Sequence, residues 1–276
     1  MQILKEILTT KDIVVVPGVY DALSATIAKQ AGCEVLYMSG FGVAGSLLGK
    51  PDIGLVTATE MIERARQITN VAGTTPVIAD GDNGYGGEYN VERLVQTYEQ
   101  AGIQCIQLED QVSPKRCGHM ADKQVVTLAE AEQKIDAAVR ARNSDRFLIM
   151  ARTDSLATHG LTEALQRGEA FLAAGADILF IEAPDSVAQL EAIKRAFPNT
   201  PLVINLVEDG KTPLLSLPQV RELGFQIVLR PISALLTAAK SLQDSYRAIA
   251  NNNWLDKNQR LNFQGYNEIV GLNRYL

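Results

Sequence analysis

Eight short runs of apolar, largely β-branched residues recur along the chain, and they restrict its fold more than any other feature. They lie at residues 13–18, 35–40, 75–82, 105–110, 147–153, 178–183, 201–206 and 226–231. Each run is apolar almost throughout, which is typical of parallel strands that are buried on both faces. Amphipathic stretches lie between the runs, among them residues 90–102, 127–143 and 161–175. Several of the connecting segments close with a glycine, as a helix C-cap in the left-handed conformation favours: Gly32, Gly102, Gly175 and Gly224.

The alternation of strands and helices predicts an α/β fold, and eight strands predict a (β/α)8 TIM barrel. A doubly wound open sheet is the alternative, and it would carry a G-x-G-x-x-G turn after an early strand. The first strand instead runs into "PGVYDALSA" at residues 17–25, which lacks that pattern. No Pro/Ser-rich linker interrupts the series, so we expect residues 1–276 to form one barrel domain.

The segment after the expected eighth helix, residues 251–276, carries apolar side chains that a complete barrel has no room to bury. Trp254, Phe263 and Tyr266 belong to it. A neighbouring subunit would cover such residues, so we interpret this segment as a C-terminal oligomerisation extension. The expected assembly is a homodimer or a homotetramer.

The charge and cysteine pattern exclude several kinds of partner. The formal net charge is −6 and no cluster of Lys and Arg is present, which argues against a nucleic-acid surface. The apolar runs are too short to span a bilayer, and the first residues show no basic segment followed by a long apolar one. Cys33, Cys105 and Cys117 are odd in number and scattered, which suits a reducing compartment. We therefore expect a cytoplasmic protein without nucleic-acid or membrane partners.

Acidic residues gather at the ends of the third and fourth expected strands. Asp80 and Asp82 stand two apart, a spacing that points both side chains to one face of an extended chain, and Glu109 ends the next strand. Converging carboxylates repel one another unless a cation or protons compensate. Oxygen ligands of this kind suit Mg²⁺, with Mn²⁺ as the alternative. The other interpretation is a glycine-rich turn without a metal.

Residues 109–120, "EDQVSPKRCGHM", concentrate charged and reactive side chains in one expected loop. Lys115 and Arg116 precede Cys117, and neighbouring positive charge lowers a thiol pKa and prepares it for proton transfer. Gly118 would allow the backbone to approach a ligand closely. The alternative is a solvated polar loop, so the segment indicates a catalytic loop without establishing one.

A series of motifs occurs in a fixed order over roughly residues 10 to 240, namely "PGVYDALSA", "YMSGFGVAGSLLGKPD", "DGDNGYGG", "QLEDQVSPKRCGHM", "ARTD", "IEAP" and "VINLVE". This series resembles the isocitrate lyase / phosphoenolpyruvate mutase superfamily, in its branch of 2-methylisocitrate lyase-like and dimethylmalate lyase-like proteins. It implies a barrel whose last helix is swapped between the subunits of a dimer or tetramer. That agrees with the interpretation of the C-terminal segment.

The resemblance also implies roles for individual residues. Magnesium would be bound by acids, with direct or water-mediated contacts, from Asp80, Asp82, Asp52 and Glu109. The substrate would be held by residues of several strand ends, namely Ser39, Gly40, Phe41, Gly118, Arg152, Glu182 and Asn205. Cys117 matches the loop cysteine that exchanges a proton with the carbanion-like carbon in the lyases, so Cys117 and Arg152 are the expected catalytic residues.

Two departures within the superfamily narrow the expected reaction. Phosphonomutases typically carry Asn where Cys117 stands, so the cysteine favours carbon–carbon cleavage. The methylisocitrate lyases have "YPLSAFRA" where this chain reads "RPISALLT", which puts Leu236 in place of a carboxylate-binding arginine. Arg230 is a candidate replacement for that charge.

The expected enzyme is therefore a magnesium-dependent lyase that cleaves a small 2-hydroxy or 2-oxo dicarboxylate by retro-aldol chemistry. Three alternatives stay open. They are a phosphonomutase similar to carboxyphosphonoenolpyruvate or phosphoenolpyruvate mutase, an oxaloacetate hydrolase or decarboxylase, and a ligand-binding barrel without turnover.

Overall fold

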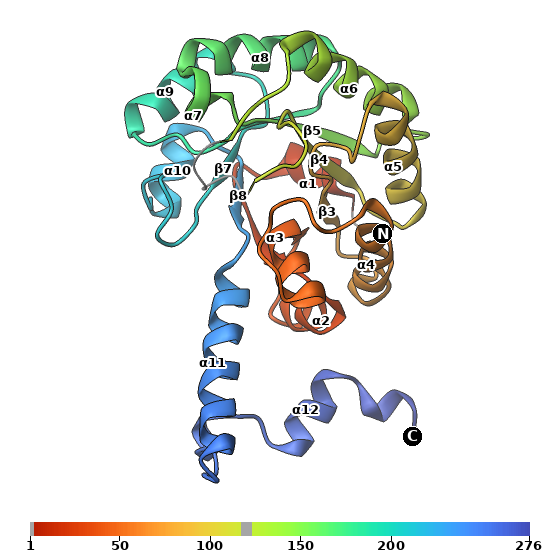
Figure 1. The fold of residues 1–276 in the computed structure, drawn as a ribbon, viewed down its shortest axis with the longest axis vertical. Helices are drawn as coiled ribbons and strands as arrows, with labels where there is room; N and C mark the ends of the chain where they lie inside the picture. The colour runs from red at the N-terminus through yellow and green to blue at the C-terminus, as the bar shows by residue number, and fades with distance from the viewer. Residues whose placement is uncertain (1–2, 117–122) are drawn as a thin grey trace.

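Eight parallel strands form a nearly closed barrel, with helices around its outside (Figure 1). The computed structural model describes residues 3–116 and 123–276. Sheet order runs β6-β5-β4-β3-β2-β1-β8-β7, and a single parallel bridge between Leu179 and Leu202 joins β6 to β7. The strands are β1 (Val14–Val19), β2 (Leu36–Met38), β3 (Val77–Asp80), β4 (Cys105–Glu109), β5 (Leu148–Thr153), β6 (Ile178–Ile181), β7 (Val203–Asn205) and β8 (Ile227–Arg230).

The predicted (β/α)8 fold is confirmed. Seven strands lie within the runs predicted for them, and β1 extends one residue beyond its run. The four glycines expected after helices all adopt positive φ, between 78° and 99°, where a side chain would be strained.

The helices fall into a barrel set and a C-terminal set. The barrel set comprises α1 (Leu4–Thr10), α2 (Ala22–Gln30), α3 (Gly40–Val43), the π-helical turn η1 (Ala44–Leu48), α4 (Ala58–Ala72), α5 (Glu88–Gln100), α6 (Leu128–Ala141), α7 (Ser155–His159), α8 (Leu161–Ala173), α9 (Val187–Ala196) and α10 (Leu217–Leu223). The C-terminal set comprises α11 (Ser233–Ala250), η2 (Lys257–Gln259), α12 (Phe263–Ile269) and η3 (Leu272–Arg274).

Alternate residues of each strand point into the barrel and out toward the helices, as the two-residue period of a strand requires. The inward side chains form one apolar cluster, which includes Ile78, Met150 and Phe180. Helix α1 closes the lower end of this cluster with Leu4 and Ile7, and the Leu4 backbone N–H donates to Gln104 Oε1 at 2.8 Å. Because the bottom is plugged, the open end of the barrel is the one where the strands finish.

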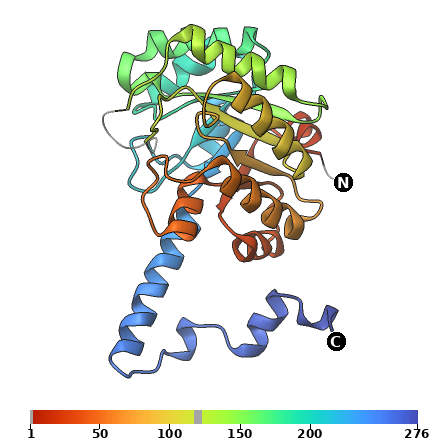
Figure 2. The same cartoon turned by 45° about the vertical axis from the view of Figure 1, so that its right-hand side comes forward.

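Helix α11 leaves the barrel instead of packing along it (Figures 1 and 2). None of its eighteen residues, all of them described, is buried. The chain then returns below the barrel, where Gln30 Nε2 of α2 donates to the Ile269 carbonyl of α12 at 2.8 Å. We call residues 233–276 the C-terminal arm. The expected separate segment at 251–276 thus begins where α11 ends.

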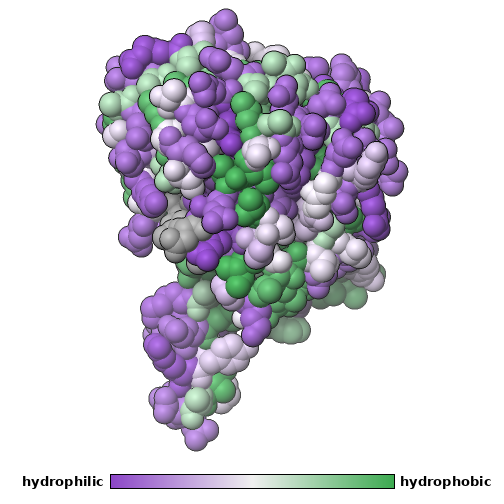
Figure 3. Space-filling model, turned by 45° about the horizontal axis from the view of Figure 1, so that its top comes forward, coloured by the Kyte–Doolittle hydropathy of each residue, from purple (hydrophilic) through white to green (hydrophobic). Residues whose placement is uncertain are grey.

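Hydrophobic side chains are exposed on the arm and on the barrel beside its base (Figure 3). On the arm, Tyr246 is 67% exposed, Trp254 97% and Phe263 83%. On α2, Leu23 and Ile27 are also exposed. These residues fit the expectation that something further covers the arm. Among the described helices, none is long and apolar enough to cross a bilayer.

Candidate active site

A cavity of about 240 Å³ opens at the carboxyl ends of the strands, where barrel active sites lie. Its walls include eight of the residues expected to form the site, namely Ser39, Phe41, Asp52, Asp80, Glu109, Arg152, Glu182 and Asn205. Several of these continue the inward-facing rows of their strands, which explains how residues far apart in the sequence meet. Gly40 and Asp82 lie directly behind this wall, in contact with Asp80 and Lys115.

Lys115 lies among the acids on one side of the cavity. Its Nζ is 2.5 Å from Asp52 Oδ1 and 2.6 Å from Asp82 Oδ1, and its side chain is only 5% exposed. Burial lowers the pKa of Lys115, but the charges of Asp82, Asp80, Glu109 and Asp52 outweigh it and raise that pKa well above its ordinary value. The lysine is therefore an ammonium ion at neutral pH.

Asp80 ends β3 and is held by three neighbours. The Gly40 backbone N–H donates to its Oδ2 at 3.2 Å, while Gln107 Nε2 and the Asp82 backbone N–H donate to its Oδ1. A Cβ on Gly40 would lie 2.7 Å from Asp80 Oδ2, so only glycine allows this approach. Burial, together with the negative charge of Asp82, raises the pKa of Asp80 to about 6.

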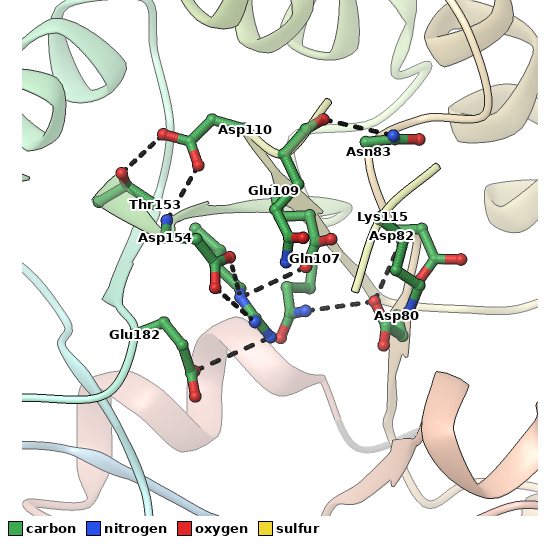
Figure 4. Close-up of polar contacts among 12 residues, drawn as sticks. Asp80, Asp82, Asn83, Gln107, Glu109, Asp110, Lys115, Thr153, Asp154 and Glu182 are labelled. Atoms are coloured by element: carbon green, nitrogen blue, oxygen red, sulfur yellow. Dashed lines mark hydrogen bonds and ion pairs between the residues drawn. The ribbon is translucent and has the colours of Figure 1, made fainter. Parts of the chain in front are cut away.

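The expectation that Asp80 and Asp82 share a face of an extended chain is wrong in its geometry. Strand β3 ends at Asp80, and Asp82 has a φ of +46°, which places it in a turn. The reason is local: the Asp80 carboxylate accepts the Asp82 N–H and so stabilises the turn. Both acids still face the same cation, because Lys115 approaches Asp82 from the segment after β4 (Figure 4).

Arg152 is the cationic side chain on the other side of the cavity. Its guanidinium donates to both carboxylate oxygens of Asp154, at 2.9 and 3.1 Å, and lies 3.4 Å from Glu109 and 3.8 Å from Glu182. The guanidinium also stacks 5.2 Å from the centre of the Phe180 ring. A planar donor fixed in this way is suited to grip a carboxylate.

A second layer of polar contacts, which includes Asp110, fixes Asp154 (Figure 4). Lys123 Nζ donates to Asp154 Oδ1 at 2.5 Å, and the Asp154 backbone N–H donates to Asp110. Burial raises the pKa of Asp154, but the charges of Arg152 and Lys123 prevail and lower it to about 2. Asp154 is thus ionised, and it orients the arginine from outside the cavity.

The segment expected to hold a substrate carboxylate begins α3. Ser39 is the N-cap of that helix, and its Oγ accepts the Gly42 backbone N–H at 3.3 Å. The side chains of Ser39 and Phe41 line the cavity, whereas the Gly40 N–H is directed at Asp80. The Gly40 amide therefore serves the acid cluster, and Ser39 is the polar group of this segment that faces the cavity.

The wall formed by β7, β8 and the loops after them carries an apolar patch of Val207, Leu229 and Ile232. Polar residues of the same wall lie beside this patch, namely Asn205, Glu208 and Asp209. Leu236 does not line the cavity but lies in a separate surface groove along α11. Arg230 is exposed and does not line the cavity either, because its neighbour Leu229 occupies the inward position of β8. The suggestion that Arg230 replaces a carboxylate-binding charge is therefore wrong.

The acid side has the features of a site for a hard divalent cation, although no three His, Cys, Asp or Glu side chains among the described residues form a complete ligand cluster. Asp82 Oδ1 and Glu109 Oε1 are buried without a hydrogen-bond donor. Burial raises the pKa of Glu109 well above its ordinary value, and the charge of Arg152 lowers it only in part. Mg²⁺ usually takes one or two carboxylates and keeps several waters. Some of the acids Asp80, Asp82, Asp52 and Glu109 would therefore bind it directly and the others through water.

Cys117 and Gly118 lie outside the described residues, so their expected roles remain predictions.

Several polar residues that the structure brings to the site were not predicted from the sequence. Among them are Lys115, Tyr37 and Gln107, and the acids Glu208 and Asp209 of the cavity wall. Lys115 was considered only as a neighbour of the cysteine, although it contacts acids. Tyr37 lines the cavity and donates to Gln107 Oε1 at 3.0 Å, and Gln107 in turn holds Asp80. Tyr37 and Gln107 could have been predicted, because they occupy inward-facing positions in the two-residue period of β2 and β4.

The phosphoenolpyruvate phosphomutase family matches residues 4–250 of the chain. The chain is 43% identical over 273 residues to 2,3-dimethylmalate lyase of Eubacterium barkeri, which covers 98% of this chain and 94% of that protein. It is 41% identical to 2-methylisocitrate lyase of Aeropyrum pernix, over 90% of this chain and 79% of the relative.

Solved structures of related proteins have the same fold. A crystal structure of 2,3-dimethylmalate lyase superposes with a TM-score of 0.94 at 38% identity, over 99% of this chain and 91% of that one. Oxaloacetate acetylhydrolase in complex with 3,3-difluorooxalacetate gives 0.93 at 34% identity, over 99% and 93%. Phosphonopyruvate hydrolase in complex with oxalate and Mg²⁺ gives 0.84 at 28% identity, over 95% and 92%.

Proposed function

The chain belongs to the phosphoenolpyruvate phosphomutase family, and we propose that within it this protein is a magnesium-dependent lyase that cleaves 2,3-dimethylmalate or a similar alkyl-substituted malate. The observation that carries the proposal is that one cavity combines charged groups with an apolar patch. Lys115, Arg152 and acids supply the charges, and the patch consists of Val207, Leu229 and Ile232, next to the acids Glu208 and Asp209. A small dicarboxylate with methyl groups matches both features, because its carboxylates suit the charged groups and its methyl groups suit the apolar patch.

Bound Mg²⁺, held by Asp80 and Asp82 with Asp52 and Glu109, would withdraw electrons from the oxygens of the 2-hydroxy carboxylate. Arg152 grips a substrate carboxylate, since Asp154 fixes its planar donor group. Ser39 offers a further hydroxyl at the cavity wall. Glu182 and Asn205, whose side chains lie 3.4 Å apart, complete the polar wall.

In the proposed reaction the proton of the C2 hydroxyl passes to a cavity carboxylate and the C2–C3 bond breaks. C2 becomes the carbonyl carbon of pyruvate, and C3 keeps the electron pair as the enolate-like form of propionate. Cys117 then donates its thiol proton to C3, and the thiolate is reprotonated before the next turnover. This role rests on the "KRCGH" segment and on the family resemblance.

Removal of the metal should abolish turnover. With excess chelator, the release of pyruvate from 2,3-dimethylmalate should fall below detection, and excess Mg²⁺ or Mn²⁺ should restore it because the acids need a divalent cation. A coupled assay for pyruvate provides the measurement. Calcium, which is larger and tolerates irregular coordination, is the control cation. Full activity in protein shown by elemental analysis to be free of metal would contradict the site.

We further propose that the C-terminal arm packs on a second copy of the chain. Its support is the exposure of Tyr246, Ile249, Trp254 and Phe263, together with an eighth helix that leaves its own barrel. The assembly is a homodimer or homotetramer, and its proposed compartment is the cytoplasm, which suits the cysteine pattern.

Light scattering at micromolar concentration should therefore give at least twice the mass of the chain. Ile249→Asp should shift the protein toward the monomer, because it places a charge in an apolar contact. Lys257→Asp, a charge change at an exposed polar position of the arm, is the matched control. A monodisperse monomer of the unaltered protein would exclude the proposed assembly.

A further inference from the structure

Among the described residues, Lys115 supplies the closest positive charge to Asp52 and Asp82, whereas Glu109 and Glu182 lie closest to Arg152. Lys115 bridges Asp52 and Asp82, which no backbone contact brings together, and it is almost fully buried. Arg152 directs its shortest contacts to Asp154 on the opposite side. The lysine therefore carries most of the compensation that the Asp52, Asp80 and Asp82 carboxylates receive.

The contact between Lys115 and Asp82 is a buried ion pair, with Nζ 2.6 Å from Oδ1. Neither Asp82 Oδ1 nor Glu109 Oε1 accepts a further hydrogen bond from the described residues. Both oxygens therefore keep lone pairs for a cation that binds them directly.

We propose that Lys115 is an internal counter-cation that stabilises the acid cluster in the metal-free protein and competes with the divalent metal for Asp52 and Asp82. The inference rests on the proposed metal site. It adds that Lys115 weakens the binding of the metal to this site.

Competition follows from the distances. A magnesium ion on a carboxylate oxygen lies about 2.1 Å from it. A metal and the Lys115 ammonium on the same Asp82 oxygen would then be no more than about 5 Å apart, in a buried region where like charges repel strongly. Binding of the metal must displace the lysine or overcome its repulsion, and either one weakens metal binding.

The test compares the unaltered protein with Lys115→Met, which keeps the length of the side chain and removes its charge. Both proteins are stripped with chelator. Unfolding is then followed at pH 8, in chelator with NaCl and in excess MgCl2 at equal ionic strength. Isothermal calorimetry gives the Mg²⁺ dissociation constant of each. Neither measurement depends on catalysis.

The expected results have a definite sign. Without metal, Lys115→Met should lower Tm by about 5–10 °C, because buried carboxylates lose their counter-charge. With Mg²⁺ the loss should shrink to less than half of that, and the variant should bind Mg²⁺ on the order of tenfold more tightly than the unaltered protein.

Lys134→Met is the matched control. Lys134 is also a buried lysine, but its Nζ donates to the Asn83 carbonyl and lies 3.8 Å from Glu130, outside the acid cluster. Its loss of Tm should be equal with and without Mg²⁺, and its Mg²⁺ affinity should equal that of the unaltered protein.

An equal loss of Tm for Lys115→Met in both conditions, or weaker Mg²⁺ binding, overturns the inference. Lys115→Gln is the second variant. If neither variant folds even with Mg²⁺, the inference is also overturned, because the lysine would then be needed for the fold itself. If the unaltered protein itself neither binds Mg²⁺ nor is stabilised by it, the proposed metal site fails instead.

Discussion

Arg152→Lys should lower kcat/KM for 2,3-dimethylmalate on the order of 10²–10³-fold, the usual loss when a fixed donor to developing charge is removed. Lysine keeps the positive charge but cannot reproduce the planar pair of bonds to Asp154, so its ammonium has no fixed direction. Steady-state kinetics with saturating Mg²⁺ measure the effect. The melting temperature, recorded alongside, separates a loss of chemistry from a loss of fold.

Arg142→Lys is the control for this substitution. Arg142 is partly buried and pairs with Asp177 at 2.6 Å, at the end of the barrel opposite the cavity. Its variant should lose some stability and keep its kinetics. If Arg152→Lys changes kcat/KM by less than about threefold, far below the range for a removed donor, then Arg152 does not grip the substrate.

Cys117→Ser should reduce kcat on the order of 10²–10⁴-fold, the range for loss of a general acid. Serine resembles cysteine in shape but holds its proton far more tightly, so the carbanion at C3 would be protonated slowly. KM should change little, because Arg152 and Ser39 still hold the substrate. Steady-state measurement of pyruvate release over a range of substrate concentrations provides both constants.

Cys33→Ser is the matched control, since burial raises the pKa of the Cys33 thiol and the residue lies outside the cavity. Its kinetics should equal those of the unaltered protein. A phosphoryl mutase would tolerate serine at position 117, because its reaction protonates no carbon. Near-unchanged kcat in Cys117→Ser would therefore remove the thiol from the mechanism.

The strands could be predicted because each is buried on both faces and is apolar almost throughout. The short helices α1, α3 and α7 could not, since elements of seven, four and five residues contain too few turns to show a helical period. The departure of α11 from the barrel was foreseen only through the family resemblance. An amphipathic helix has the same sequence pattern whether its apolar face packs on its own barrel or on a neighbouring subunit.

The acids of the site were predictable from a simple rule, because the carboxyl ends of parallel strands converge. Lys115 was not, since adjacency in the sequence paired it with Cys117, whereas the fold pairs it with Asp52 and Asp82. The geometry at Asp82 was not predictable either. Its turn depends on a hydrogen bond to Asp80 that the two-residue spacing of the acids does not reveal. Contacts set by the folded chain, rather than by strand ends, escaped prediction.

The proposed cleavage is tested most directly by product analysis in D2O. With 2,3-dimethylmalate and Mg²⁺, we expect pyruvate and propionate in equal amounts. NMR and mass spectrometry should show one solvent deuterium at C2 of propionate. Cys117→Ser should form the same products more slowly. Absence of pyruvate from 2,3-dimethylmalate and its alkyl homologues, together with release of oxalate and acetate from oxaloacetate, would contradict the lyase and identify a hydrolase instead.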